Sequence, residues 1–345
     1  WESGRIDSLL ALCRAGRGDV LTPALLTRPE QTALCDPFAP VMPLNLAALV
    51  KRLAATETGR RVGVVVRACE WRAIVELAKL RQVNLAGIVA IGVDCLGTYS
   101  AADYARLWRE AGEPDLLWRG ARTGEASPPA GYALRTACQI CEHPVADGPA
   151  IRIGLLGLDY PHQLLVESDA GLPIAGPAPD EATRQAREEA IAALTAQRRA
   201  ERRRILGAWR ERVRDVAQLA AEFAACVRCE NCMVACPICY CKECIFRTPT
   251  FDHESEQYFR WAERRGALRL PADGLLFHLT RLNHMATSCV GCGACESACP
   301  QHLPVATLFP ATAERVQGLF GYEAGRSLDE ELPLATFRED ELPDV

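Results

Sequence analysis

The sequence has few aromatic residues, few histidines and no long apolar run. Of its 345 residues, 6% are aromatic and six are histidines, which are scattered along the chain. We find no Ser-His-Asp arrangement and no acid–base group that would indicate hydrolytic catalysis. No uncharged apolar stretch approaches the length needed to cross a membrane. The net charge of −5 is small for this length, so neither nucleic acid nor a membrane is predicted as the main partner.

Cysteine is the residue type that the chain has in excess, at 17 positions. No signal peptide precedes them, so the cysteines indicate a reducing, cytoplasmic compartment and metal ligation rather than a disulfide scaffold. The sequence begins with Trp1 rather than Met, so we expect a preceding piece, in which a targeting segment could lie. The length allows two or three domains with hydrophobic cores.

Eight of the cysteines form two runs with the same spacing, C-x2-C-x2-C-x3-C-P. The runs are Cys226, Cys229, Cys232, Cys236 with Pro237, and Cys289, Cys292, Cys295, Cys299 with Pro300. This spacing is typical of thiolates that hold a cubane 4Fe–4S cluster, and the fourth cysteine often ligates the other cluster of a pair. We therefore predict two quartets: Cys226, Cys229, Cys232 and Cys299, and Cys289, Cys292, Cys295 and Cys236. Two structural zinc sites are the alternative, but zinc more often uses paired C-x2-C units.

A strand–helix–strand pattern precedes these runs. Residues 61–66 and 87–93 read as short buried strands, and residues 70–80 between them form an amphipathic helix. The two strands should therefore be parallel neighbours. Cys69 and Cys95 each follow the carboxyl end of one strand, so both thiols should lie on the same rim of the sheet, where α/β folds bind ligands.

A C-x2-C pair, Cys138 and Cys141, follows on a predicted loop. Together with Cys69 and Cys95 it could close a third cube. The alternative is that Cys69 and Cys95 are buried small apolar residues. Five cysteines remain: Cys13, Cys35, Cys239, Cys241 and Cys244. The last three could form a further metal site, replace Cys236 as a ligand, or be structural thiols.

The remaining segments suggest the domain organisation. We expect an α/β domain over residues 1–168, a linker and long helix over 169–225 with Asp180 as its N-cap, a mainly helical two-cluster ferredoxin domain over 226–320, and a C-terminal tail over 321–345. The long helix is predicted to run over 181–223, and shorter helices over 45–53, 275–285 and 311–319.

Five arginines between 198 and 204 read as a solvated helix face or, alternatively, as a surface for an acidic partner. Residues 1–60 are otherwise weakly patterned, but Gly16, Gly18 and Thr22 form a Gly-rich turn that could approach a phosphate or could be a plain loop.

Taken together, these motifs resemble the beta subunits of formate dehydrogenases linked to the deazaflavin coenzyme F-420, within the wider family of coenzyme F-420 hydrogenase beta subunits. The resemblance covers most of residues 41–335. It rests on the segments that carry Cys69, Cys95, Cys138 and Cys141, on the runs 226–244 and 288–300, and on the tail segment 321–327.

The resemblance implies an FAD-bearing α/β domain, with Gly16, Gly18 and Thr22 as flavin contacts, and a flavin-proximal cluster on Cys69, Cys95, Cys138 and Cys141. It also implies a catalytic partner of the formate dehydrogenase alpha or hydrogenase type, and a further electron-transfer subunit. We therefore expect an iron–sulfur, flavin-containing redox subunit of an oxidoreductase complex. The segment after Thr22 is shorter here than in the family, which favours an alternative: a flavin-free electron-wire and docking subunit of a heterodisulfide-reductase-like or hydrogenase complex.

Overall fold

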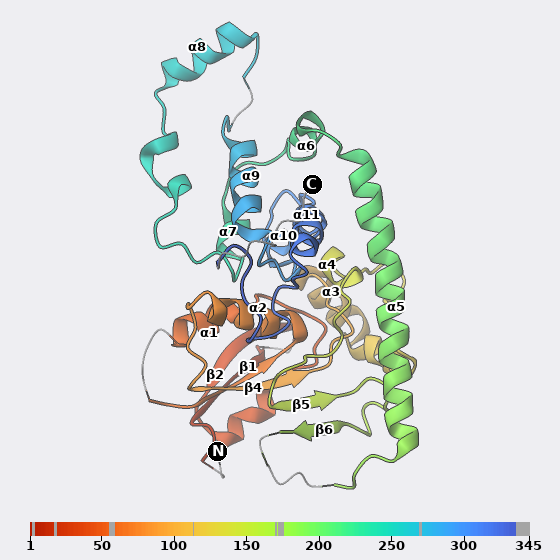
Figure 1. Cartoon of the computed structure of the whole chain (residues 1–345). Coiled ribbons are helices and arrows are strands. Elements are labelled where there is room, and N and C mark those ends of the chain that lie inside the picture. The colour runs from red at the N-terminus through yellow and green to blue at the C-terminus, as the bar shows by residue number, and fades with distance from the viewer. Residues whose placement is uncertain are drawn as a thin grey trace.

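The computed structural model describes residues 1, 4–16, 19–54, 59–112, 114–169, 171, 176–268 and 271–335. Its N-terminal half is built on one six-stranded sheet with the order β2-β1-β3-β4-β5-β6 (Figure 1). The strands are β1 Ser8–Ala15, β2 Val20–Leu26, β3 Val62–Val66, β4 Ile88–Val93, β5 Ile151–Gly154 and β6 Leu165–Ser168. The four central strands are parallel, and the two edge strands pair antiparallel to their neighbours. The predicted parallel pairing of 61–66 with 87–93 is confirmed by the register of β3 and β4.

A hairpin of β1 and β2 occupies the weakly patterned N-terminal region. Six residues of β1 are buried, whereas β2 alternates between exposed and buried positions because it forms the edge of the sheet. Pro23 lies on β2 opposite Leu12, and an edge strand tolerates proline because one side of it needs no ladder hydrogen bonds. Because of that proline and the short polar turn, the sequence pattern did not indicate this pair of strands.

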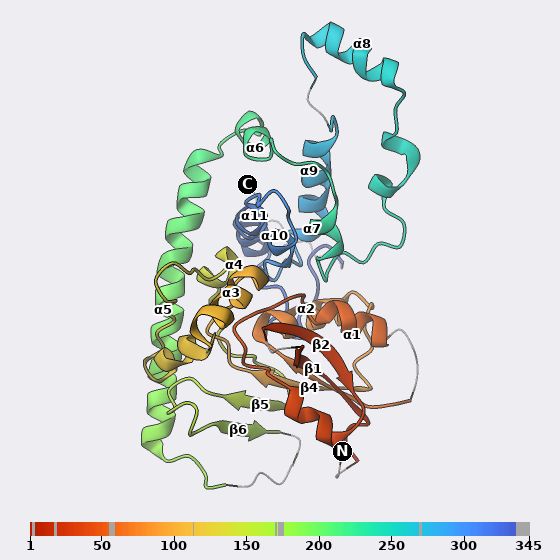
Figure 2. The same ribbon diagram turned by 180° about the vertical axis from the view of Figure 1, so that it is seen from behind.

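Helices α1 (Ala47–Ala54) and α2 (Ala68–Lys79) lie between the sheet and the helical C-terminal half, as Figures 1 and 2 show from opposite sides. Both helices were predicted within two residues of their ends. Four further short helices connect the α/β part: η1 Pro29–Leu34, α3 Ala101–Ala111, η2 Pro114–Thr123 and α4 Thr136–Gln139.

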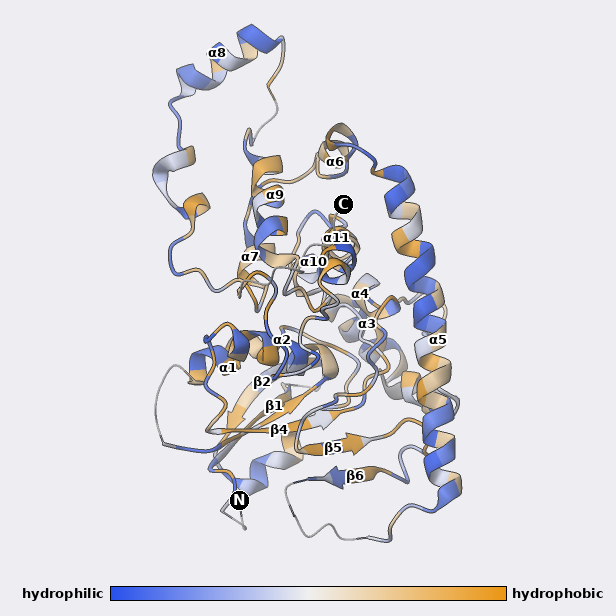
Figure 3. Ribbon diagram, viewed as in Figure 1, coloured by the Kyte–Doolittle hydropathy of each residue, from blue (hydrophilic) through white to orange (hydrophobic). Residues whose placement is uncertain are grey.

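A long helix, α5 (Glu181–Arg212), runs along one side of both halves of the molecule (Figure 2). Its predicted N-cap is confirmed, since Asp180 Oδ1 accepts a hydrogen bond of 2.8 Å from the Thr183 amide. The prediction of one helix over 181–223 is wrong. The chain leaves the helix at Val213, and Asp215 caps a second helix, α6 (Val216–Glu222). Figure 3 shows that α5 is mostly hydrophilic with apolar positions between, and its buried residues include Leu194, Leu206 and Trp209.

The C-terminal half is helical and surrounds the two cysteine runs. Its helices are α7 Asn231–Val234, η3 Ile245–Arg247, η4 Pro249–Phe251, α8 Ser255–Arg265, α9 Gly274–Met285, α10 Ala294–Ser297 and α11 Val305–Leu319. The segment with η3, η4 and α8 projects away from the rest of the chain (Figure 1). Helix α11 begins six residues before the predicted 311–319 and contains Pro310, so the expectation that this proline precedes the helix is wrong.

One hydrophobic cluster joins the two halves. It includes Val64 of β3 and Ile74 of α2, and it continues through Trp209 of α5 to Met285 of α9 and Phe309 of α11. The α/β part and the helical part therefore bury apolar surface against each other rather than forming two separate cores. Within the part of the chain that the structure describes, no helix is both long and apolar enough to traverse a bilayer.

Arg187 of α5 forms a buried ion pair with Asp94, which follows β4. Its two terminal nitrogens lie 2.6 and 3.1 Å from the Asp94 carboxylate, which also accepts hydrogen bonds from the amides of Leu155 and Leu156. Both side chains are almost inaccessible to solvent. The pair therefore fixes α5 to the carboxyl edge of the sheet beside Cys95.

We predict that Arg187→Leu destabilises the protein by about 3–5 kcal/mol, because the Asp94 carboxylate would stay buried without its cation. Anaerobic urea unfolding measures this loss. Arg184→Leu, one turn earlier on the exposed face of α5, is the control and should leave the midpoint almost unchanged. Equal midpoints for the two variants would contradict this account.

Candidate iron–sulfur sites

The rim site consists of Cys69, Cys95, Cys138 and Cys141, which line one cavity. Cys69 lies in the first turn of α2 and Cys95 follows β4, so both sit at the carboxyl edge of two adjacent parallel strands, as predicted. Cys138 belongs to α4 and Cys141 comes directly after it. Burial raises the pKa of Cys95 to about 11, and the thiols of Cys138 and Cys141 act in the same direction. Such effects require thiols that lie close together.

Three hydrogen-bond donors reach the sulfurs of the rim site. The Gly97 amide lies 3.3 Å from Cys95 Sγ, Thr98 Oγ1 lies 3.2 Å from Cys138 Sγ, and Arg135 Nη2 lies 3.3 Å from the same sulfur. Burial acts to raise the pKa of Cys138, but Arg135 and Thr98 hold it below its usual value. The position of Cys138 thus favours the thiolate, the form in which cysteine binds iron, whereas burial raises the pKa of the other three rim thiols.

The middle site consists of Cys236, Cys289, Cys292 and Cys295. Burial raises the pKa of Cys289 to about 12 and that of Cys292 to about 11, and the Cys236 thiol adds to both increases. Burial and then Cys236 also raise the pKa of Cys295 well above its usual range. Cys236, the fourth cysteine of the first run, therefore lies against the first three cysteines of the second run.

The terminal site consists of Cys226, Cys229, Cys232 and Cys299. Burial raises the pKa of Cys232 to about 11, and the thiols of Cys226, Cys299 and Cys229 contribute in the same direction. Cys299, the last cysteine of the second run, thus lies with the first three of the first run. The structure brings together the residues of both predicted quartets, including the exchange of their fourth members.

Two side chains of α9 contact the sulfurs of the terminal site. Arg281 Nη1 lies 3.0 Å from Cys232 Sγ, and His278 Nε2 lies 3.3 Å from Cys226 Sγ. Burial, and then the charge of Arg281, lowers the pKa of His278 to about 4, so its ring is neutral at pH 7. Both residues are buried, and nothing in their sequence spacing indicated a role.

No group of three or more Cys, His, Asp or Glu side chains among the described residues is arranged to hold a single metal ion. The thiolates of a cube bind four separate irons and are therefore spread more widely than the ligands of one ion. The three quartets fit the cube by their number of thiols, their burial and their sulfur-directed donors. Which cysteines ligate iron stays a prediction.

The rim and middle sites adjoin each other. Cys292 lines the rim cavity, and its thiol contributes, after burial, to the raised pKa of Cys69. The contact depends on Gly293, whose φ is 69° and whose added Cβ would lie only 2.3 Å from the Cβ of Ala137, the residue before Cys138. A side chain at position 293 would force the two cysteine loops apart.

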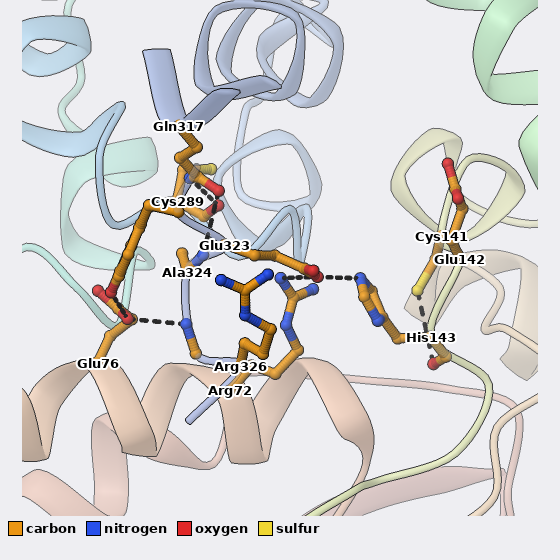
Figure 4. Close-up of polar contacts among 12 residues, drawn as sticks. Arg72, Glu76, Cys141, Glu142, His143, Cys289, Gln317, Glu323, Ala324 and Arg326 are labelled. Carbon is orange, nitrogen blue, oxygen red and sulfur yellow. Dashed lines mark hydrogen bonds and ion pairs between the residues drawn. The ribbon is translucent and has the colours of Figure 1, made fainter. Parts of the chain in front are cut away.

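The C-terminal segment ties the loops of both sites to α2, as Figure 4 shows. Glu323 lies 3.0 Å from Arg72 of α2 and 3.1 Å from His143 Nε2, two residues after Cys141. Gln317 of α11 donates hydrogen bonds to the carbonyls of Cys289 and Ala286, and its side-chain oxygen accepts one from the Ala324 amide. The tail segment from 321 to 326 therefore acts as a structural clamp between the two sites and α2, while residues 336–345 lie outside the described residues.

The arginines between 198 and 204 do not form one solvated face. Arg198 is buried and donates a hydrogen bond of 2.6 Å to the Leu96 carbonyl beside the rim site, and Arg202 contacts Glu314 and Glu142. Arg203 and Arg204 are exposed, as that prediction requires. The solvated-face prediction is wrong for Arg198.

The five remaining cysteines fall into two places. Cys239 lies beside the middle site: burial raises its pKa to about 11, and the thiols of Cys236, Cys241 and Cys244 add to that effect. Cys13 and Cys35 lie apart from the quartets, in an antiparallel bridge with their sulfurs 3.6 Å apart. Whether Cys239, Cys241 and Cys244 form a further metal site, replace Cys236 as a ligand or are structural thiols stays open.

We predict that Gly293→Ala destabilises the protein more than Gly291→Ala does. Both glycines have φ of 69° on the same loop, but nothing lies within 4 Å of a Cβ at position 291. The strain common to both variants is about 1–2 kcal/mol, and the clash with Ala137 adds about 1–3 kcal/mol. Removing the opposing methyl group, in Gly293→Ala with Ala137→Gly, should recover the second part in a double-mutant cycle measured by urea unfolding. Additive effects in that cycle would contradict the close approach.

Known proteins resemble the chain in two ways. Residues 222–303 match the model of a family described as a 4Fe-4S dicluster domain. The F-420-dependent formate dehydrogenase subunit beta of Methanocaldococcus jannaschii is 25% identical over 358 residues, covering 95% of this chain and 89% of the relative. The F-420-dependent formate dehydrogenase 1 subunit beta of Methanococcus maripaludis is 25% identical over 368 residues, covering 97% of this chain and 89% of the relative.

Among solved structures, a chain of the F-420-reducing NiFe hydrogenase complex from Methanosarcina barkeri aligns with a TM-score of 0.38 and 12% identity, covering 61% of this chain and 81% of that one. The two formate dehydrogenase subunits, in contrast, match from the sheet to the C-terminal clamp. The resemblance to formate dehydrogenase beta subunits that the cysteine motifs predicted is therefore confirmed, and it extends over almost the whole chain.

Proposed function

We propose that this chain is the iron–sulfur electron-transfer subunit of a formate dehydrogenase or hydrogenase complex, and that it relays single electrons between a catalytic subunit and another redox partner. One observation carries the proposal: twelve thiols in three adjoining quartets, with Cys292 against the rim site and Cys236 and Cys299 exchanged between the two runs. Cubes bound there would each take up and release one electron.

The chain's own residues supply burial, spacing and charge. The cysteines of the rim and middle sites are buried or half-buried, and amide, hydroxyl and guanidinium donors lie against the sulfurs of Cys95 and Cys138. Hydrogen bonds to sulfur and local charge tune the potential of an iron–sulfur cluster. Arg135 and Arg281 are suited to this task because an arginine keeps its charge at any physiological pH.

Of the three sites, the terminal site is the best placed to exchange electrons with a redox partner. Cys229 is the exposed member of the twelve, and Val227 and Val234 of the same cysteine run are 55% and 62% exposed. An exposed ligand position brings a bound cube close to the surface, where a partner can reach it. We assign this face to the catalytic subunit, of the formate dehydrogenase alpha or hydrogenase type, and the opposite end of the relay to the further electron-transfer subunit.

Of the residues predicted to contact FAD, the two that the structure describes, Gly16 and Thr22, do not lie at a helix N-terminus. Gly16 lies in the turn of the β1–β2 hairpin, Gly18 lies outside the described residues, and Thr22 is on β2 with its hydroxyl 3.5 Å from the Pro23 carbonyl. The turn leads into a strand, so it offers no helix N-terminus to a pyrophosphate. We therefore assign no electron-transfer step to a flavin, and this observation favours the flavin-free electron wire as the second candidate.

Metal analysis of protein purified without oxygen tests the proposal. We expect about twelve irons and as many acid-labile sulfides per chain, since each cube has four irons. Cys69→Ser and Cys226→Ser should each lower the iron content by about four. Cys35→Ser, outside the quartets, is the control and should lower it by none.

The alternatives give different results in the same experiment. About eight irons, unchanged in Cys69→Ser, would leave the rim site without a cube. Zinc in a colourless protein without sulfide would end the proposal. One FAD per chain would support the flavin-containing form, and its absence the flavin-free wire.

A further inference from the structure

Arg135 lies between the rim and middle sites and contacts residues of both. It precedes α4, and its Nη2 lies 3.3 Å from Cys138 Sγ of the rim site. Its Nη1 donates to the Cys292 carbonyl of the middle site at 3.3 Å and to Ser297 Oγ at 3.1 Å. Its Nε donates to Thr98 Oγ1 at 2.8 Å, so the plane of the guanidinium group is fixed. One permanent cation is thus held against a rim sulfur and against the loop of the next quartet.

Two more arginines line the rim cavity, and both are buried. Arg198 donates to the Leu96 carbonyl, and Arg67 donates to the Ala39 carbonyl at 2.8 Å. Arg67 has a carboxylate nearby, because its Nη1 lies 3.9 Å from Glu70. Among the residues that the structure describes, no ion pair with a carboxylate is formed by Arg135 or Arg198. The rim site therefore keeps about two positive charges that no buried anion offsets.

The other two sites have less uncompensated positive charge of their own. At the terminal site, Arg281 contacts Cys232 Sγ, but Arg228 is paired with Asp273. At the middle site, Arg72 acts on Cys289 but is paired with Glu323. The nearest unpaired cations of the middle site, Arg135 and Arg281, are shared with its two neighbours.

A buried positive charge favours the reduced form of a cube, because reduction adds one negative charge to the cluster. That interaction is strong where burial lowers the local dielectric constant, and hydrogen bonds to the sulfurs act in the same direction. Burial without nearby cations or hydrogen-bond donors would favour the oxidised cube, because burial disfavours the more highly charged form. The rim cavity is lined by three guanidinium groups, and two of them, those of Arg135 and Arg198, have no carboxylate partner among the described residues.

We propose that the rim site binds the cube of highest reduction potential in this chain, and that Arg135 is the positioning residue that sets this potential and couples the rim site to the middle site. The inference rests on the proposed function, because it requires cubes in all three quartets. Electrons that enter at the exposed terminal site would then collect on the cube of the rim site. No sequence motif indicated a direction for this relay.

Redox titration followed by electron paramagnetic resonance tests the proposal on the anaerobically purified full chain. The rim signal is identified as the one missing from Cys69→Ser, and it should be the first of the three to appear as the potential is lowered. In Arg135→Met the rim potential should shift to more negative values while the terminal potential stays in place. In Arg281→Met the terminal potential should shift and the rim potential should not. Arg184→Met, on the exposed face of α5, should change neither.

A conservative variant separates charge from packing. Arg135→Lys retains the positive charge but not the fork of donors, so it should restore most of the rim potential that Arg135→Met loses. If Arg135→Met fails to retain four of the irons, Arg198→Met provides the same test, because Arg198 does not bridge the two sites and its removal should also lower the rim potential.

Two results would overturn the inference: a rim signal that appears after either of the others, or a rim potential that neither Arg135→Met nor Arg198→Met changes. Failure of the proposed function would give a different result. About eight irons per wild-type chain, and no signal lost in Cys69→Ser, would mean that the rim site holds no cube.

Discussion

The arrangement of the rim and middle quartets depends on buried carboxyl and amide groups that join the segment 317–325 to helix α2 and to the Cys289 loop. Glu76 of α2 accepts hydrogen bonds from the Tyr322 hydroxyl and the Gly325 amide, and Gln317 is bonded to both the tail and the Cys289 loop. These groups have no access to water, so a lost partner would leave an unsatisfied buried group at a cost of about 1–3 kcal/mol. The network is therefore rigid, and the helix that carries Cys69 shares it with the loop that carries Cys289.

Backbone geometry supports the same attachment. Gly325 has φ of 75°, and a Cβ there would lie 2.4 Å from the Arg72 carbonyl of α2. The tail can approach α2 closely only because this residue has no side chain. Distant parts of the sequence thus meet at a few contacts, and those contacts determine how closely two quartets approach each other.

Charge compensation follows from this packing. Gathering twelve thiolates in a poorly solvated region is unfavourable unless cations or hydrogen-bond donors accompany them. Arg135 and Arg281 provide that compensation from outside the cysteine motifs: one precedes α4 and the other lies on α9, and each reaches a sulfur. Their flat guanidinium groups, which offer several donors in one plane, suit narrow spaces between adjoining sites.

The cysteine spacings in the sequence were enough to predict two ferredoxin-type quartets, including the exchange of Cys236 and Cys299, because the geometry of a cube restricts how far apart its ligands can be along a tight loop. The parallel pair β3 and β4, with Cys69 and Cys95 at its carboxyl edge, followed from short buried strands around an amphipathic helix. Local patterns failed where the edge strand β2 carries a proline and where Asp215 restarts the helix after Val213.

Only the tertiary structure decided which residues surround the thiols. Arg135 precedes α4, His278 and Arg281 lie on α9, and Gln317 lies on α11. Apart from Arg135 and Cys138, which are three residues apart, none of them is near in sequence to the cysteine that it contacts. Contacts between residues so far apart in sequence are set by how helices pack on a sheet, and that packing leaves no periodic trace in the chain. The sequence thus determined what the protein can bind, whereas the fold decided how close the sites lie and which charges act on them.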